Sequence, residues 1–331
     1  MPANLTPQYL EAEKLFREAK TKEEKLAALE EMYALLPKHK GTDKLKAGIK
    51  QRISKLKKTE EKKLTKASEA FLIKREGAGQ LAVIGPPSSG KSSLLAALTK
   101  AKPKIGPYPF TTAMPLPGIM DYEDVQIQLV DLPPITEAGM EGWQFNIIRN
   151  SDALLFVADT EDADVLSEIE VVIEQLKKRR VELINEEVKE TAPIGTVYKK
   201  TFLVANKMDA PLAADNLPVL KEFFGNKFRI IPISTFDDKK LKDLKKDIFL
   251  LLKIIRVYSK PPGKPPDLDR PFTLPVGSNV TDLAKAIHKD FTSGLEKARL
   301  WGSARFDGQA VPYDYLLRDK DVVELHLKKK E

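Results

Sequence analysis

The chain has 331 residues, which is enough for two or three domains of ordinary size. Apolar residues make up 42% and charged residues 31%, the balance of a globular protein, and the net charge is +7. No run of about 18 apolar residues occurs, so the sequence predicts no membrane-spanning helix. The absence of cysteine excludes disulfides and thiolate metal sites, and the N-terminus has no signal-peptide pattern. We therefore expect a cytoplasmic protein.

Residues 1–78 are predicted to form a helical arm. Pro7 is typical of the first turn of a helix, and "TKEE" at 21–24 has the pattern of a capping box. The helix that follows this box is expected to stop before Pro37, and a third helix is expected to start near Thr42.

The arm is strongly basic over part of its length. From Lys38 to Lys66 it carries twelve Lys or Arg residues against three acids. One interpretation is a solvated helix face, which is what most charge runs are. The other is an arm that follows the phosphate backbone of a nucleic acid. The sequence leaves both interpretations open.

Residues 79–258 alternate short apolar runs with helical patterns. The runs "LAVIG", "VQIQLVDL", "DALLFVAD", "KTFLVANKMD" and "FRIIPIS" are rich in Val, Ile, Leu and Phe, and "SSLLAALTKA" and "VLSEIEVVIEQLKKRR" have helical spacing. Buried strands that alternate with helices predict an α/β fold, a mostly parallel sheet with helices on both faces. An apolar helix is expected from Phe249 to Val257.

A proline-rich linker is predicted at residues 259–270, where "SKPPGKPPDLDR" has the composition of a semi-rigid spacer. Residues 271–331 then combine strand-like runs with one amphipathic helix, "NVTDLAKAIHKDF". They predict a second, small α+β domain. Three scattered histidines and no cysteine predict no zinc site in any of these regions.

The segment "GPPSSGKS" at 85–92 fits the phosphate-binding pattern G-x-x-x-x-G-K-[ST], between a predicted strand and a predicted helix. Its glycines would let the backbone wrap around phosphates, while Lys91 would reach the β- and γ-phosphates and Ser92 would bind Mg²⁺. The predicted phosphate-binding residues are Gly85, Ser88, Ser89, Gly90, Lys91, Ser92 and Ser93.

The segment "NKMD" at 206–209 predicts the base. Asp209 can accept hydrogen bonds from N1–H and N2–H₂ of guanine, whereas adenine would leave the carboxylate unpaired. Asn206 is placed to bond N7 and the nearby backbone, and Lys207 to cover the base and ribose. After the next strand, Ser234 and Thr235 in "ISTF" are expected to support the base from a second loop.

The remaining predicted residues handle Mg²⁺ and the γ-phosphate. Asp131 ends a predicted strand and would hold Mg²⁺ through water. In "YPFTT", Thr112 is the first choice and Thr111 the second for a hydroxyl that binds Mg²⁺ and the γ-phosphate. Lys91 and Thr112 are thus the predicted catalytic residues.

The order "GPPSSGKSS…YPFTT…DLPP…NKMD…IST" resembles the Obg-type GTPases of the translation-factor class. The tail "RPFTLPVGSNVTDLAKAIHKDF…DYLLRDKDVVELHL" resembles a TGS domain, a small β-grasp module. With the helical arm, the whole is most similar to the developmentally regulated GTP-binding (DRG) subfamily and its prokaryotic relatives. That resemblance implies GTP and GDP as ligands, Mg²⁺, slow hydrolysis, and association with a ribosome or structured RNA through the arm and the TGS domain, with an activating protein as a further partner.

The sequence departs from the family pattern at several positions. Many relatives have asparagine at the position of Ser88, where it helps to hold a stimulatory K⁺, so stimulation by K⁺ is doubtful here. Ile135 replaces the glutamine that orients water in other GTPases, and Pro134 replaces a glycine whose N–H binds the γ-phosphate. DRG proteins also usually carry a larger insertion than residues 185–199.

Three functions fit these residues. The first is a slow GTPase that acts as a switch on a ribosome or other RNA. The second is a regulatory module that binds GTP and GDP with negligible hydrolysis. The third is an RNA-binding adaptor that nucleotide merely stabilises.

Overall fold

The computed structural model describes residues 7–18, 22–36, 45–46, 48–53, 73–99, 114–186, 195–288, 291 and 294–327. Contacts divide the chain into two compact units, residues 1–72 and residues 73–331. Across these described stretches, no helix has both the length and the apolar character that crossing a membrane requires.

The first unit is a small helical assembly with a core of its own. Helices α1 (Pro7–Glu18) and α2 (Lys22–Leu35) start and stop where the proline and capping signals predict. They bury Tyr9 and Leu29 together with Ile49, which lies in a helical stretch at 48–53. The rest of the predicted third helix, and most of the basic run from Lys38 to Lys66, lies outside the described residues.

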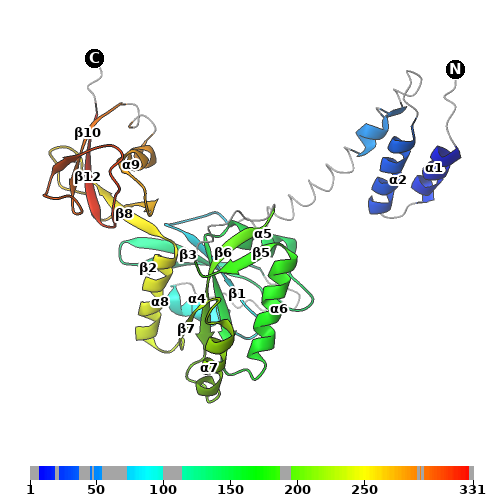
Figure 1. Cartoon of the computed structure of the whole chain (residues 1–331), viewed down its shortest axis with the longest axis horizontal. Helices are drawn as coiled ribbons and strands as arrows, with labels where there is room; N and C mark the ends of the chain where they lie inside the picture. Colours follow the sequence, from blue (N-terminus) through cyan, green and yellow to red (C-terminus); the bar gives the residue numbers. More distant parts are fainter. Residues whose placement is uncertain are drawn as a thin grey trace. The chain divides into compact units, whose positions relative to one another are not determined.

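The second unit begins with an α/β domain. Its sheet has the strand order β2-β3-β1-β4-β6-β5, and β7 pairs with β6 (Figure 1). The β2–β3 pair is antiparallel and the other pairings of this sheet are parallel, which confirms the predicted fold class. The strands are β1 (Gln80–Ile84), β2 (Leu116–Tyr122), β3 (Val125–Asp131), β4 (Ala153–Asp159), β5 (Val181–Ile184), β6 (Val197–Asn206) and β7 (Arg229–Pro232).

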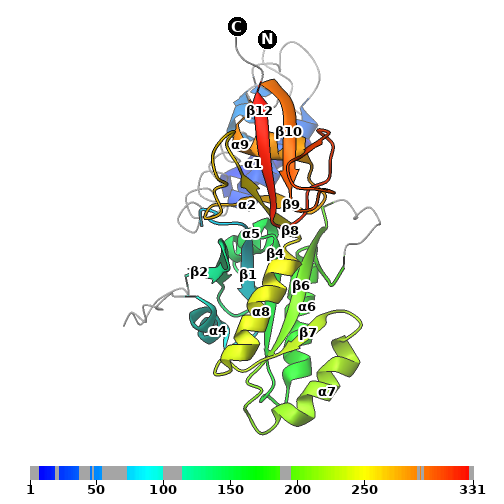
Figure 2. The ribbon, with the colours of Figure 1, turned by 90° about the vertical axis from the view of Figure 1, so that its left-hand side faces the viewer.

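Helices cover both faces of this sheet (Figures 1 and 2). On one face lie α5 (Gly142–Asn150), α6 (Val165–Lys178) and α7 (Ala213–Phe224), and on the other lie α4 (Lys91–Leu98) and α8 (Asp238–Leu251). Because parallel strands are covered on both sides, every residue of β4 is buried and its sequence shows no polar alternation.

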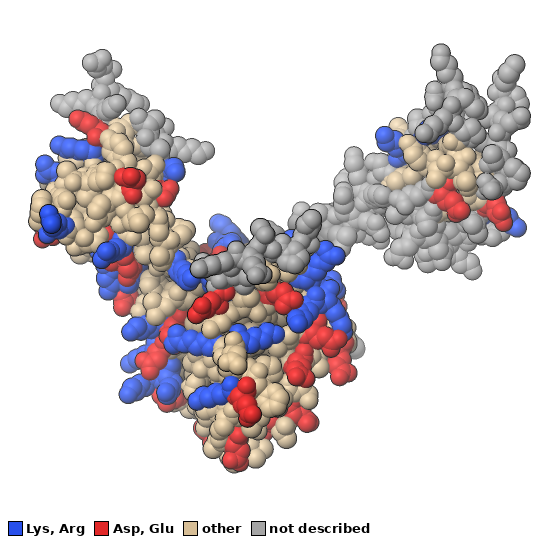
Figure 3. Space-filling view, viewed as in Figure 1, with Lys and Arg blue, Asp and Glu red and all other residues tan. Residues whose placement is uncertain are grey.

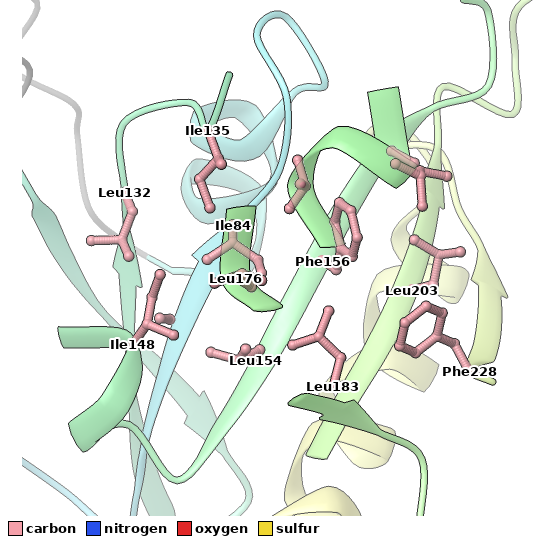
Figure 4. Packing of buried hydrophobic residues seen from close by; sticks show 14 of the residues in the cluster. Ile84, Leu132, Ile135, Ile148, Leu154, Phe156, Leu176, Leu183, Leu203 and Phe228 are labelled. Atoms are coloured by element: carbon pink, nitrogen blue, oxygen red, sulfur yellow. The ribbon is translucent and has the colours of Figure 1, made fainter. Parts of the chain in front are cut away.

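The core on the α6 side holds the largest buried aromatic side chains of the domain. Figure 4 shows Phe156 of β4 and Phe228, whose rings meet edge to face with their centroids 6.4 Å apart. Leu176 comes from α6, whose buried residues recur at helical spacing, and it packs in the same cluster. Trp143 also packs against this cluster.

One predicted element is wrong. The apolar helix expected from Phe249 to Val257 does not form, because α8 already ends at Leu251. After a turn, Ile254–Ser259 forms strand β8, which belongs to the sheet of the C-terminal domain. Val257 is buried in that sheet, so the domain boundary predicted at residue 258 falls inside a strand. The apolar run alone did not distinguish the end of a buried helix from a buried strand.

The C-terminal domain is a five-stranded sheet with one helix. Its strand order is β11-β10-β12-β8-β9, and helix α9 (Val280–Ile287) buries Leu283 against the sheet. Asn279 caps this helix together with Asp282 in a capping box. The other strands are β9 (Phe272–Pro275), β10 (Leu295–Trp301), β11 (Gln309–Val311) and β12 (Asp321–Leu327).

The substitution Phe156→Ala is expected to destabilise the α/β domain by about 3–5 kcal/mol, because it opens a cavity in a side-chain cluster that is fully buried. Phe236→Ala is the matched control, since Phe236 is 86% exposed and its removal should change stability by less than about 0.5 kcal/mol. Urea unfolding followed by circular dichroism measures both. Equal midpoints for Phe156→Ala and the parent chain would contradict this packing.

Candidate nucleotide-binding site

The predicted functional residues meet at one edge of the sheet. The loop 85–92 follows β1, Asp131 ends β3, Asp159 ends β4 and Asn206 ends β6. The parallel registers Val83 with Asp131 and Asp159 with Asn206 place these residues side by side at the carboxyl ends of the strands. In open α/β sheets this edge is where ligands bind.

The two glycines of the phosphate-binding loop stand where a side chain would not fit. Gly85 has φ +151°, and a Cβ there would lie 2.3 Å from the carbonyl oxygen of Val157. Gly90 has φ +88°, and its Cβ would lie 2.3 Å from Nδ2 of Asn206. The loop therefore approaches two neighbouring strands more closely than any other residue type allows.

Lys91 lies folded over its own loop. Its Nζ donates hydrogen bonds to the carbonyl oxygens of Pro86, at 2.5 Å, and Gly85, at 3.2 Å. The residue is 7% exposed, and burial lowers its pKa to about 8, against the opposing charges of Asp131 and Glu168. The ammonium group is thus poorly solvated, and a bound phosphate would provide the anionic partner that it lacks.

A hydroxyl and a carboxylate meet beside this lysine. The Ser92 hydroxyl donates to Oδ2 of Asp131 at 2.5 Å, and the buried Oδ1 of Asp131 has no hydrogen-bond partner among the described residues. Burial raises the pKa of Asp131, while Ser92 and Lys91 act in the opposite direction. Oxygen ligands of this kind are the ones Mg²⁺ prefers, so the donor set fits that ion. Thr111 and Thr112 lie outside the described residues.

Asn206 links the base end of the site to the phosphate end. Its Nδ2 donates to the carbonyl oxygen of Ser89 at 3.0 Å, and its buried Oδ1 has no hydrogen-bond partner in the described parts of the chain. Asp209 is exposed, and no described residue donates a hydrogen bond to its carboxylate. Both side chains therefore offer acceptor atoms toward a ligand.

A second loop lies beside the "NKMD" segment. Met208 donates its backbone N–H to the carbonyl oxygen of Ile233 at 3.0 Å, which joins the two loops. Ser234 is buried, and its hydroxyl accepts the N–H of Phe236 at 3.2 Å. Thr235 is half-buried, whereas Ser88 and Ser93, at the opposite end of the site, are exposed.

Two residues that the sequence did not single out position this segment. Asp159 accepts a hydrogen bond from Nζ of Lys207 at 2.5 Å, which raises the pKa of Lys207. Lys207 has φ +61°, an uncommon backbone conformation for lysine. Its hydrogen bond to Asp159 fixes the direction of the side chain. Thr160 is fully buried and donates both its N–H and its hydroxyl to the carbonyl oxygen of Asn206. In the sequence, Asp159 could have been recognised as an acid at the end of a predicted buried strand.

The backbone after Asp131 has no spare N–H group for four residues. Leu132 donates to the carbonyl oxygen of Val83 at 3.1 Å, and Ile135 donates to that of Gly85 at 3.2 Å. The two residues between them are Pro133 and Pro134, which have no N–H. Ile135 is 1% exposed and packs in the core beside Leu132 (Figure 4), so its side chain points away from a ligand.

Side chains from two helices hold the following loop. Gln144 of α5 donates to the carbonyl oxygen of Pro133 at 3.0 Å. Gln175 of α6 donates to that of Glu137 at 3.1 Å, and Arg179, at the C-cap of the same helix, donates to that of Met140 at 3.3 Å. The segment is therefore fixed without a ligand.

Comparison with known proteins agrees with this geometry. Residues 80–207 match the family described as 50S ribosome-binding GTPase, and residues 255–327 match the TGS domain. The α/β domain is thus a P-loop GTPase domain, and the C-terminal domain is a TGS domain.

Similar proteins align with most of the chain. Over 93% of the chain it is 28% identical to an uncharacterized GTP-binding protein of Methanocaldococcus jannaschii, 93% of which is covered. It is 28% identical to Developmentally-regulated G-protein 1 of Arabidopsis thaliana, with 93% of this chain and 92% of that protein covered. Ribosome-interacting GTPase 1 of Saccharomyces cerevisiae is 27% identical, with 91% and 98% covered. Over most of its length the chain is thus similar to GTP-binding proteins, among them a developmentally-regulated G-protein.

The substitution Asp159→Asn is expected to weaken guanine-nucleotide binding by about tenfold, because Lys207 loses a charge-assisted hydrogen bond. Asp162→Asn is the control, since that acid lies in the same loop and its carboxylate accepts from Asp164 instead. Titration with a fluorescent GDP analogue measures both affinities. Equal affinities in the two variants would show that Asp159 does not position Lys207.

Proposed function

We propose that this protein is a slow GTPase that works as a switch on a ribosome or another structured RNA in the cytoplasm. The observation that carries the proposal is the convergence of Lys91, Asp131 and Asn206 at one sheet edge, beside an Asp209 whose carboxylate is open to a ligand. A phosphate group, a metal ion and a base would each find suitable donors or acceptors there.

Different residues are assigned to the phosphates, the base and the metal ion. The loop 85–92 and Lys91 bind the β- and γ-phosphates, and Asn206 and Asp209 recognise guanine while Ser234 and Thr235 support it. Ser92, Asp131 and Thr112 would hold Mg²⁺, which when bound neutralises charge on the phosphates. Asp131 retains one unpartnered buried oxygen for this purpose.

Slow hydrolysis follows from the segment after Asp131. Ile135 is buried and cannot orient an attacking water molecule. The N–H groups of Leu132 and Ile135 already have acceptors, and Pro134 has none to give. Binding of the γ-phosphate thus loses a contact that other GTPases use to distinguish GTP from GDP.

An RNA partner is supported by three observations. The yeast relative is named ribosome-interacting, and the family matched by residues 80–207 is described as ribosome-binding. The run from Lys38 to Lys66 is the most basic part of the chain. On the face that Figure 3 shows, by contrast, Lys and Arg alternate with acids over the α/β domain. The arm is therefore the segment best suited to a phosphate backbone.

The main alternative is a regulatory module that binds GTP and GDP with negligible turnover. The loop after Asp131 favours it, because its backbone N–H groups at Leu132 and Ile135 already have acceptors within the protein and none is left there for a γ-phosphate. Release of phosphate over several turnovers separates a GTPase from such a module. Binding to RNA that is independent of guanine nucleotide would instead identify an adaptor.

The substitution Asp209→Asn is expected to shift base preference from guanine toward xanthine, whose additional carbonyl accepts a hydrogen bond from the new amide. The parent chain should bind GTP and GDP far more tightly than ATP. Asp215→Asn, an exposed acid on α7, is the control and should keep the guanine preference. Equal affinity of the parent chain for ATP and GTP would refute the assignment of Asp209.

The parent chain is expected to bind GDP and GTP with affinities within about tenfold of each other, or 1.4 kcal/mol, since one charge-assisted hydrogen bond is missing. Pro134→Gly should increase the preference for GTP, because the new N–H can reach the γ-phosphate. Pro262→Gly, in the exposed loop between β8 and β9 that the sequence predicted as a linker, controls for the greater flexibility of glycine. A parent chain that already prefers GTP by a hundredfold, unchanged by Pro134→Gly, would show that another residue detects the γ-phosphate.

Deletion of residues 1–66 is expected to weaken cosedimentation with ribosomes and to flatten its dependence on salt, because the basic run is lost. Nucleotide affinity should stay the same, since the arm forms a separate unit. Cosedimentation is measured with GDP, with a non-hydrolysable GTP analogue and without nucleotide. Unchanged binding at every salt concentration would make the basic run an ordinary solvated surface.

A further inference from the structure

Arg256 is a buried cation that contacts both domains of the second unit. It lies on β8 and is 3% exposed, so its guanidinium group is almost completely removed from water. The group lies 4.8 Å from the ring centroid of Phe249, and that ring stacks on Tyr122 of β2 with centroids 5.1 Å apart. A charge in such a place requires several acceptors.

One of the acceptors lies within the TGS domain. Asp319 receives two bonds from the guanidinium, Nε to Oδ1 at 3.0 Å and Nη2 to Oδ2 at 2.6 Å, and it also accepts the backbone N–H of Arg256. This forked pairing belongs to the TGS domain itself, and it fixes the direction of the remaining guanidinium nitrogen.

The remaining nitrogen reaches the turn between β2 and β3 in the α/β domain. Nη1 donates to Oε2 of Glu123 at 2.5 Å and to Oδ1 of Asp124 at 2.7 Å. Tyr258 donates its hydroxyl to the other oxygen of Asp124, and Lys320 lies 3.0 Å from Oε2 of Glu123. The turn therefore presents two carboxylates to Arg256 and Lys320 of the TGS domain.

The other end of this hairpin belongs to the nucleotide site. Asp131, proposed to hold Mg²⁺, is the last residue of β3 and pairs with Leu116, the first residue of β2. Seven consecutive antiparallel pairs connect these residues to Tyr122 and Val125 beside the turn. A change in the position or register of the hairpin at Asp131 must therefore also move the turn.

The loop after Asp131 is a poor reporter of nucleotide state, because helices and the phosphate-binding loop hold it already. The turn of the hairpin contacts the TGS domain through its two acids, and it contacts α8 through Tyr122, which stacks on Phe249. The turn is the point where the α/β domain presents two acids to Arg256.

We propose that the position of the TGS domain depends on the bound nucleotide, and that the β2–β3 hairpin transmits this dependence. The contact of Arg256 with Glu123 and Asp124, called the joint below, couples the domain to the hairpin. The nucleotide-dependent part of this inference rests on the proposed function. The joint itself does not, because it consists of contacts between two domains of the same chain. Glu123 and Asp124 act as positioning residues, and neither touches the nucleotide site.

The test removes the acids of the turn and leaves the Arg256–Asp319 pair in place. The double variant Glu123→Gln with Asp124→Asn keeps the shape of both side chains and removes their charge. Glu174→Gln is the control, since it removes a surface ion pair with Lys178 that lies away from the joint. Because the chain has no cysteine, Glu222→Cys on α7 and Glu296→Cys on β10, both exposed, give a unique pair of spin labels.

Hydrogen exchange in the nucleotide-free full-length chain examines the joint alone. Amides near the turn, at Val125 to Ile127, should exchange at least about tenfold faster in the double variant, since the carboxylates that pair with Arg256, Tyr258 and Lys320 are lost. The control should match the parent chain. Equal exchange in the double variant and the parent would overturn the joint.

Distances between the spin labels examine the coupling. In the parent chain the distribution should be narrow and should differ between GDP and a non-hydrolysable GTP analogue. In the double variant it should be broader and the same with both nucleotides. A parent distribution that is identical with the two nucleotides would overturn the coupling. The affinities of the same samples for GTP and ATP are measured as well. A chain with no preference for GTP would refute the proposed function independently of the distances between the labels.

Discussion

The parallel register of β1 with its two neighbours is the constraint on which the nucleotide site depends. It places the end of β3 beside the end of β1, while β4 continues past both to Asp159, so that a loop, an acid and a second acid gather at one edge although the sequence separates them. The same alignment places the loop against the Val157 carbonyl and the Asn206 side chain, where glycine is required at positions 85 and 90. Interchanging or slipping any of these strands would separate the phosphate end of the site from the base end.

The backbone hydrogen bonds after Asp131 explain how the chain differs from other nucleotide switches. Other GTPases keep one N–H after the metal-binding acid available for the γ-phosphate. Here the two prolines remove two N–H groups, and strand β1 and Gly85 accept the two that flank them. The same bonds that deny this contact to the ligand also stiffen the segment. The route that we propose for sensing the nucleotide is therefore the β2–β3 hairpin, which ends at the metal-binding acid.

Buried charge is used differently in the two domains. In the nucleotide site, Lys91 and Asp131 are buried with incomplete partners, which favours a ligand that completes them. At Arg256 the partners are complete: the hydrogen bonds to Asp319, Glu123 and Asp124 hold the pKa of the guanidinium above its ordinary value, although burial acts in the opposite direction. Removing the acids on one side would leave a desolvated cation, so the geometry of this contact is strongly specified.

Some features of this protein were determined by sequence alone. The spacing of "GPPSSGKS" and "NKMD" between apolar runs predicted the fold class and the residues that gather at the sheet edge, because each motif is local and needs one kind of turn. Proline at position 134 likewise removes an N–H in any structure.

Other features were decided by tertiary structure. Ile254–Ser259 is as apolar as the end of a helix, and it became a strand because the TGS sheet provides hydrogen-bonding neighbours on both sides. Asp159 and Arg256 look like ordinary charged residues in the sequence. Their roles come from partners 48 and up to 133 positions away, and only the packing of strands and domains brings such partners within hydrogen-bonding distance.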